Sequence, residues 1–220
     1  MKGRLLIVFY SKYGYTKRYV DILGNALGCD AVAVDYFKPA MLADYDRVLY
    51  IGSLRGSSIN GMKKFSPAVE HIYKKLTVCG VGALPFDPSY PDRIKEASIS
   101  VLYEKFVPVF YVQGGFCYDE LGRIEKMQIA TRVAQMSKQG ELDGTEEFFA
   151  DAVKTPVDEV KQANIQPLID YLEGKDVDKD LYSPPEITDE SEEKQFFDEI
   201  EQAAKAPENK QKALKKKLLK

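Results

Sequence analysis

The feature that most constrains the fold is an alternation between short apolar runs and longer segments with helical spacing. Residues 5–10 (LLIVFY) form a continuous run of β-forming residues, which is typical of a strand buried on both faces. The next segment, residues 16–27, places Val20, Leu23 and Leu27 on one helical face. Further strand-like runs lie at residues 31–36, 48–51, 77–81 and 106–112. This pattern predicts a doubly wound α/β domain, with a five-stranded parallel sheet and helices on both faces.

The helical segments begin and end at recognisable signals. Pro67 interrupts the apolar spacing of residues 62–72, so we expect a kink there, or a restart with Ser66 as the cap. Asn164 is expected to cap a last helix, which Gly174 ends. The other helical segments expected are residues 91–106 and 121–138.

Charge segregates towards the end of the chain. Residues 176–208 hold 12 acidic against 3 basic side chains, and residues 209–220 hold six lysines and no acid. Apolar residues also become sparse in this stretch. We therefore expect residues 1–174 to form the domain and residues 175–220 to form a charged, largely flexible tail. The tail has room for one short helix near residues 190–205.

Composition excludes several classes of function. A formal net charge of −3 argues against a nucleic-acid partner, which would require a basic face. The apolar run near the N-terminus is too short for a signal peptide or a transmembrane segment. The three cysteines lack the spacing of a disulfide framework or a metal site. We expect a cytoplasmic protein without a metal, and the lone His71 forms no recognisable catalytic constellation, so the catalytic residues stay unknown.

The loop after the first strand, residues 10–17 (YSKYGYTK), is the strongest candidate for a ligand site. Ligands of open α/β sheets bind where the carboxyl ends of strands meet the amino ends of helices. The loop matches neither the G-x-x-x-x-G-K-[ST] nor the G-x-G-x-x-G pattern. Ser11, Gly14 and Thr16 could instead wrap one terminal phosphate at the helix mouth. The same spacing also fits a simpler role, in which Ser11 or Thr16 only caps the helix.

Ser11-Lys12-Tyr13-Gly14-Tyr15-Thr16, placed after an apolar strand, resembles the FMN-phosphate loop of flavodoxins. Within that family it is most similar to the branch that includes the flavodoxin-like protoporphyrinogen oxidases. Residues 45–53, residues 112–115 and a terminal helix ending at residues 169–172 extend the resemblance over about residues 3–173. The resemblance implies a strand order of 2-1-3-4-5, with FMN at the switch point between strands 1 and 3.

The resemblance also implies which residues hold FMN. Ser11, Lys12, Tyr13, Gly14, Tyr15 and Thr16 would hold the phosphate; Ser53, Leu54, Arg55 and Gly56 would lie on one face of the isoalloxazine; and Ala83, Leu84, Pro85 and Phe86 would approach its other face or its edge. The chain departs from ordinary flavodoxins because it has no tryptophan and because Tyr13 replaces a small hydroxyl residue. Arg55 is a third departure, since a cation beside the ring would stabilise an anionic reduced flavin and raise its potential.

Two functions are compatible with these residues. The first is an FMN-binding oxidoreductase or electron-transfer protein, which acts on a redox partner or a small-molecule substrate. As an enzyme it would be an FMN-dependent dehydrogenase similar to protoporphyrinogen oxidase. The alternative is a flavodoxin-fold interaction module without a cofactor, which contacts a protein partner through its charged C-terminal tail. The intact Ser11, Gly14 and Thr16 favour the first.

Overall fold

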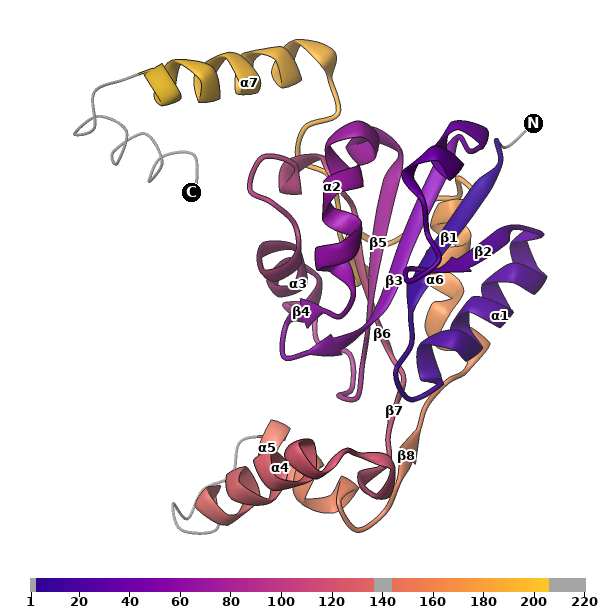
Figure 1. Cartoon of the computed structure of the whole chain (residues 1–220), viewed down its shortest axis with the longest axis vertical. Coiled ribbons are helices and arrows are strands. Elements are labelled where there is room, and N and C mark those ends of the chain that lie inside the picture. The colour runs from indigo at the N-terminus through magenta and orange to yellow at the C-terminus, as the bar shows by residue number, and fades with distance from the viewer. Residues whose placement is uncertain (1–2, 137–143, 206–220) are drawn as a thin grey trace.

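A mostly parallel β-sheet runs through the middle of the protein, which a computed structural model describes over residues 3–136 and 144–205 (Figure 1). The strands are β1 (Leu5–Tyr10), β2 (Asp30–Ala33), β3 (Arg47–Arg55), β4 (Ser58–Ile59), β5 (Leu76–Gly82), β6 (Val109–Gln113), β7 (Gly115–Phe116), β8 (Val157–Asp158) and β9 (Tyr182–Ser183). The α-helices are α1 (Tyr15–Leu27), α2 (Met62–Ile72), α3 (Tyr90–Ser98), α4 (Arg123–Met136), α5 (Gly144–Ala152), α6 (Gln162–Leu172) and α7 (Glu190–Lys205). Short 3-10 helices are η1 (Pro39–Asp44), η2 (Tyr73–Lys75), η3 (Glu104–Phe106), η4 (Tyr118–Glu120) and η5 (Lys179–Leu181).

The parallel strands lie in the order β2-β1-β3-β5-β6. This confirms the expected doubly wound α/β fold and its 2-1-3-4-5 strand order. At the centre of the sheet, Leu49 of β3 pairs with Ile7 of β1 on one side and with Thr77 of β5 on the other. β9 pairs antiparallel with β6 and adds an edge strand that the sequence pattern did not predict.

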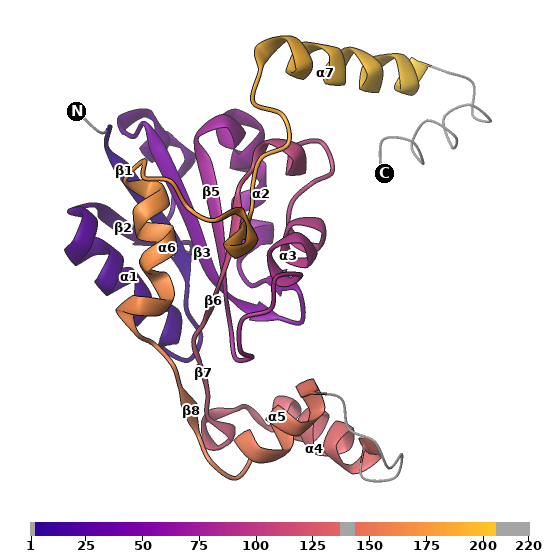
Figure 2. The same ribbon diagram turned by 180° about the vertical axis from the view of Figure 1, so that it is seen from behind.

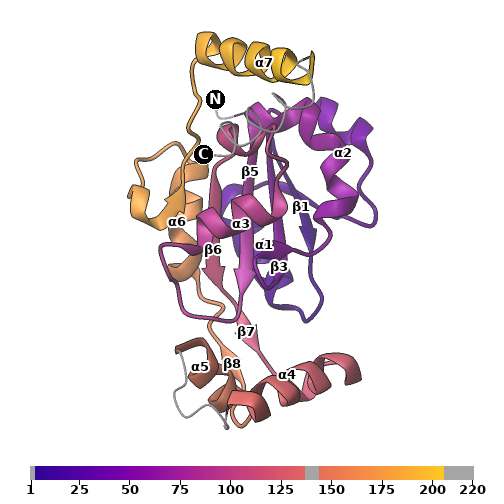
Figure 3. The same cartoon turned by 90° about the vertical axis from the view of Figure 1, so that its left-hand side faces the viewer.

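Alternate residues of each strand point to opposite faces of the sheet, so a continuous run of apolar residues makes both faces apolar. In β1, Leu6 and Val8 pack in the core beneath α2 and α3, whereas Leu5 and Ile7 pack in the core beneath α1 and α6. Figures 2 and 3 show these two helix layers on either side of the sheet. The continuous apolar run in residues 5–10 is therefore required by burial on both faces.

Three expected features of the helices differ in the structure. α2 continues through Pro67 as one helix, and the Ser66 hydroxyl donates to the Lys63 carbonyl at 3.2 Å instead of capping a new helix. In a regular helix that carbonyl would accept from the backbone N–H of residue 67, which proline lacks. Asn164 lies inside α6, where its side-chain amide donates to the Glu159 carbonyl at 2.7 Å, so the prediction that it caps the helix is wrong. The helix expected over residues 91–106 is also shorter, because α3 ends at Ser98.

A two-helix excursion separates β6 from α6. β7 and β8 form an antiparallel ribbon, and α4 and α5 lie at its far end, beyond the carboxyl edge of the sheet (Figures 1 and 3). We call residues 115–136 and 144–158 the excursion. The long helix expected over residues 121–138 is present as α4, and the last two of those residues lie outside the described part.

The chain after Gly174 contacts the opposite, amino edge of the sheet. Besides the β9 pairing, Phe196 of α7 is 8% exposed and its ring lies 5.7 Å from that of Phe106. α7 therefore lies at the end of the molecule opposite the excursion (Figure 1). The domain boundary near residue 174 stays a prediction, and the lysine-rich residues 209–220 lie outside the described part. Within the described ranges, no helix is both long and apolar enough to cross a membrane.

Candidate functional site

The loop between β1 and α1 enters the helix through Gly14. Gly14 is the N-cap residue and has a φ of +87°, a left-handed conformation that favours glycine. The backbone N–H of Lys17 donates to the Ser11 hydroxyl oxygen at 3.1 Å. Ser11 therefore satisfies one of the N–H groups that a helix start leaves without a partner. The capping role that spacing allowed for Ser11 is present in the structure.

Thr16 does not share that role. Its side chain is 1% exposed, and its hydroxyl has no hydrogen-bond partner among the described residues. Within the described part of the chain, the Arg47 Nε is the only other buried side-chain nitrogen or oxygen without a hydrogen-bond partner. A buried polar group left without a partner costs about 1–3 kcal/mol. At the amino end of α1, where free N–H groups and the helix dipole attract negative charge, an anion such as a phosphate monoester would supply the partner.

The two longest side chains of the loop reach the excursion. Lys12 donates to Glu125 Oε1 at 2.6 Å, and the Tyr13 hydroxyl donates to Glu125 Oε2. The Glu125 carboxylate also accepts from the backbone N–H of Gly122, at the start of α4, at 3.1 Å. The Lys12 and Tyr13 hydrogen bonds together hold the pKa of Glu125 down, to about 2. Sequence reasoning placed Lys12 and Tyr13 at the phosphate but did not find Glu125, which lies more than a hundred residues away.

The second predicted segment is the end of β3 and the turn after it. Leu54 and Arg55 pair with Ile59 and Ser58 of β4, and Gly56 turns the chain with a φ of +60°. The Leu54 side chain packs against the core, whereas Arg55 is exposed. The Ser53 hydroxyl, at the carboxyl end of the parallel part of β3, accepts from the Asn60 side-chain amide at 3.1 Å. This segment is therefore a tight hairpin between β3 and β4.

The third predicted segment comprises Ala83, Leu84, Pro85 and Phe86, directly after β5. Two side chains of β6 hold its backbone: the Gln113 amide donates to the Ala83 carbonyl at 3.0 Å, and the Tyr111 hydroxyl donates to the Leu84 carbonyl. The Phe86 ring is 41% exposed. Tyr111 and Gln113 were not predicted, although a tyrosine and a glutamine at the carboxyl end of an apolar strand are a usable signal.

The three segments lie at the carboxyl ends of β1, β3 and β5, which are neighbouring parallel strands, so they lie at one edge of the sheet (Figure 1). The excursion lies beyond the same edge. Its base contacts the start of α1, because Gly115 leaves room for the Tyr15 ring: a Cβ at Gly115 would clash with that ring and with the Val157 carbonyl. The structure thus brings together the segments that the sequence singled out and adds the excursion to them.

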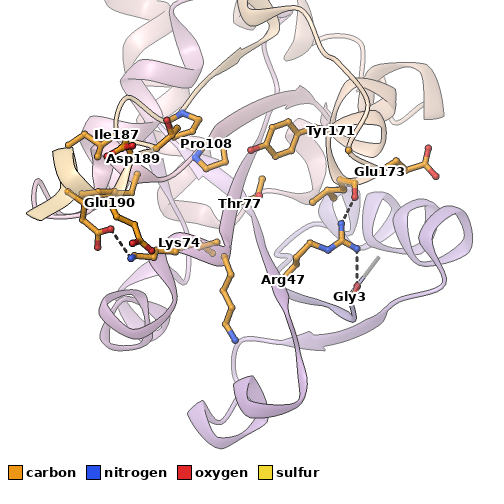
Figure 4. Close-up of a pocket in the computed structure, with 18 of the residues that line it drawn as sticks. Gly3, Arg47, Lys74, Thr77, Pro108, Tyr171, Glu173, Ile187, Asp189 and Glu190 are labelled. Atoms are coloured by element: carbon orange, nitrogen blue, oxygen red, sulfur yellow. Dashed lines mark hydrogen bonds and ion pairs between the residues drawn. The ribbon is translucent and has the colours of Figure 1, made fainter. Parts of the chain in front are cut away.

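A cavity of about 830 Å³ lies at the opposite, amino edge of the sheet (Figure 4). Its cationic side chains already have protein partners, although the Nε atom of Arg47 has none among the described residues. Lys74 pairs with Glu193 at 2.7 Å, and Arg47 donates to the carbonyls of Leu172 and Gly3. The carboxyl edge is where the helix amino ends and the unpartnered Thr16 hydroxyl lie, so we place the candidate site there and not in this cavity.

The match to a family model agrees with this assignment of the fold. A family model described as "Flavodoxin domain" matches residues 6–143. Among solved structures, the chain is similar to two-electron reduced Megasphaera elsdenii flavodoxin, with 14% identity over 49% of this chain and 82% of that chain and a TM-score of 0.37. It is also similar to oxidised Flavodoxin 2 from Bacillus cereus, with 16% identity over 67% of this chain and 98% of that chain and a TM-score of 0.34. No curated protein matches the chain.

Proposed function

Because this chain belongs to the flavodoxin domain family, we propose that it binds FMN at the carboxyl edge of its sheet and serves as an oxidoreductase or electron-transfer protein. The observation that supports this most directly is the buried Thr16 hydroxyl, which has no partner among the described residues, at the start of α1. Bound FMN supplies one- and two-electron transfer, to a redox partner or a small-molecule substrate. The residues of this chain bind the cofactor, orient it and set the charge around it.

The phosphate would be held by the backbone N–H groups of the loop and by two hydroxyls. Ser11 already accepts a hydrogen bond from the Lys17 N–H, so its own proton is available to donate to a phosphate oxygen. Thr16 has its hydroxyl proton available as well. Neutral donors at a helix start therefore make up the proposed phosphate site.

The isoalloxazine would lie between the β3–β4 turn and the segment after β5. Phe86 offers an exposed aromatic face there, which suits stacking on a flat ring. Arg55 would bring a positive charge to the other side, which favours a negatively charged reduced ring. This charge supports an FMN-dependent dehydrogenase or a moderately reducing carrier over a very low-potential one.

Oxidation of protoporphyrinogen is a finer proposal, which rests on the resemblance of residues 11–16 to that branch of the family. A protein loaded with FMN should oxidise protoporphyrinogen in the presence of an electron acceptor. If it transfers electrons to protein partners but leaves protoporphyrinogen unoxidised, the carrier function is favoured.

Cofactor binding can be tested on the purified protein. We expect a yellow protein that releases FMN on heating, identified by chromatography against FAD and riboflavin. Protein stripped of flavin should bind one FMN per chain in a fluorescence titration. A chain that is folded by circular dichroism yet binds no FMN would contradict the proposal and favour the interaction module.

A further inference from the structure

The Glu125 carboxylate brings a negative charge to the phosphate loop from a distant part of the chain. It lies in the first turn of α4 and accepts from Lys12 at 2.6 Å and from the adjacent Tyr13. The Gly122 N–H fixes the same carboxylate from its own side at 3.1 Å. The Lys12 side chain is therefore directed towards α4, and its charge is balanced by Glu125.

This contact is not required to attach the excursion to the domain. The base of the ribbon has its own connections to α1: Arg18 pairs with Asp158 at 2.6 Å, and the Tyr19 hydroxyl donates to the Gln113 carbonyl and, at 3.1 Å, to that of Glu159. The Tyr15 ring also packs on the backbone of Gly115. Glu125 can thus be changed without removing these contacts.

A free lysine in this loop would be expected to act on a phosphate. The phosphate of FMN carries close to two negative charges at neutral pH, and an ammonium a few ångströms away attracts it even in a high-dielectric environment. Lys12 is held instead by a carboxylate of the same chain. The net charge contributed by this pair of side chains is close to zero.

We propose that Glu125 sets the charge of the phosphate loop: it neutralises Lys12, so that the loop holds its phosphate with hydroxyls and backbone N–H groups and binds it more weakly than a loop with a free lysine. This inference rests on the proposed FMN site. In this role Glu125 is a positioning residue, because it acts on the phosphate through Lys12.

The proposal predicts that FMN affinity follows the net charge of the pair. Glu125→Gln leaves a net positive charge and should tighten FMN binding by about three- to tenfold at low ionic strength, with the gain shrinking as salt is added. Lys12→Met leaves Glu125 uncompensated and should weaken binding. The double variant is again neutral and should return close to the wild-type affinity. Glu125→Asp keeps the charge and should also stay close to it.

The chain offers a matched control at its other end. Glu193 of α7 also accepts from an adjacent tyrosine and lysine, Tyr73 and Lys74, at 2.5 and 2.7 Å. Glu193→Gln makes the same change in charge and in hydrogen bonding, but at the amino edge of the sheet. It should leave FMN affinity unchanged.

The experiment is a titration of flavin-free wild type and variants with FMN and with riboflavin, at low and high salt. Riboflavin lacks the phosphate, so its affinity should be the same in all of them. The proposal is overturned if Glu125→Gln binds FMN with equal or lower affinity at low salt, or if riboflavin affinity changes in parallel with FMN.

A second probe separates this inference from the proposed function. Inorganic phosphate should raise the melting temperature of Glu125→Gln more than that of wild type at matched ionic strength. If no variant binds FMN, the proposed function fails, and the phosphate measurement still decides the role of Glu125. Equal stabilisation of the two proteins by phosphate would then overturn it.

Discussion

The ammonium group of Lys95, on α3, donates a hydrogen bond to the Pro184 carbonyl, 2.8 Å away and just beyond β9. Lys95 is only 5% exposed, and burial lowers the pKa of its amine. A buried ammonium is costly without a partner. The contact therefore connects the segment after residue 174 to the folded domain, together with the packing of Phe196 on Phe106.

Two truncations test how much these contacts contribute. A chain that ends at residue 175 should still fold, because it keeps the five parallel strands and the helices on both faces. It should melt roughly 5–10 °C below a chain that ends at residue 205, since each kcal/mol corresponds to about 2–4 °C at this size. Thermal unfolding followed by circular dichroism measures the difference. Equal melting temperatures would mean that the Lys95 and Phe196 contacts contribute nothing, and an insoluble shorter chain would refute the boundary near residue 174.

Thr16→Val should separate cofactor affinity from stability. The substitution removes a hydroxyl that has no partner among the described residues, so the melting temperature of the flavin-free protein should stay the same or rise. FMN should bind about 10- to 150-fold more weakly, because a hydrogen bond to a charged group contributes roughly 1.5–3 kcal/mol. Ser11→Ala is the comparison. It should lower both the FMN affinity and the melting temperature, since Ser11 also accepts from the Lys17 N–H. Unchanged FMN affinity in Thr16→Val would refute the phosphate assignment.

Changing the charge of Arg55 tests the proposed position of the flavin ring. If the β3–β4 turn lies beside the isoalloxazine, Arg55→Glu should make addition of the second electron less favourable and lower that potential by roughly tens of millivolts. Arg55→Gln, which removes the charge without reversing it, should give an intermediate shift. Potentiometric titration of the three proteins in one buffer measures the series. A potential that is independent of the charge at residue 55 would place Arg55 away from the ring.

The ion pair between Lys12, in the loop between β1 and α1, and Glu125 predicts a dependence of stability on acid pH. The pKa of Glu125 is lowered from its ordinary 4.5 to about 2, chiefly by Lys12 and then by Tyr13. Its contribution is therefore fully present above about pH 4.5 and is lost as the pH falls towards 2. With side chains 42% and 33% exposed, the pair should contribute no more than about 1 kcal/mol. Urea unfolding should find Glu125→Gln less stable than wild type at pH 7 and equally stable near pH 2. A constant difference across this range would exclude the pair as its source.

Local patterns predicted the strands of the parallel sheet and the helix that follows β1. The apolar run at residues 5–10 is β1, and the helix predicted from residue 16 is α1, which starts one residue earlier. A strand buried on both faces needs apolar residues at consecutive positions. Such a strand can therefore be predicted from neighbouring residues alone. The hydroxyl–glycine–hydroxyl order of Ser11, Gly14 and Thr16 is local in the same sense, because a helix start is built by consecutive residues.

The position of α4 and its contact with the loop after β1 depend on the tertiary structure. The spacing in residues 121–138 predicted an amphipathic helix, yet Ile124 and Met127 of α4 are 68% and 63% exposed, because the β7–β8 ribbon carries the helix beyond the sheet edge. That displacement is what places Glu125 beside Lys12. The sequence by itself determined the strands, their burial and the hydroxyl–glycine–hydroxyl order of the loop at residues 11–16. The tertiary structure alone decided which charge surrounds that loop, since an ion pair between distant residues depends on where the intervening chain runs.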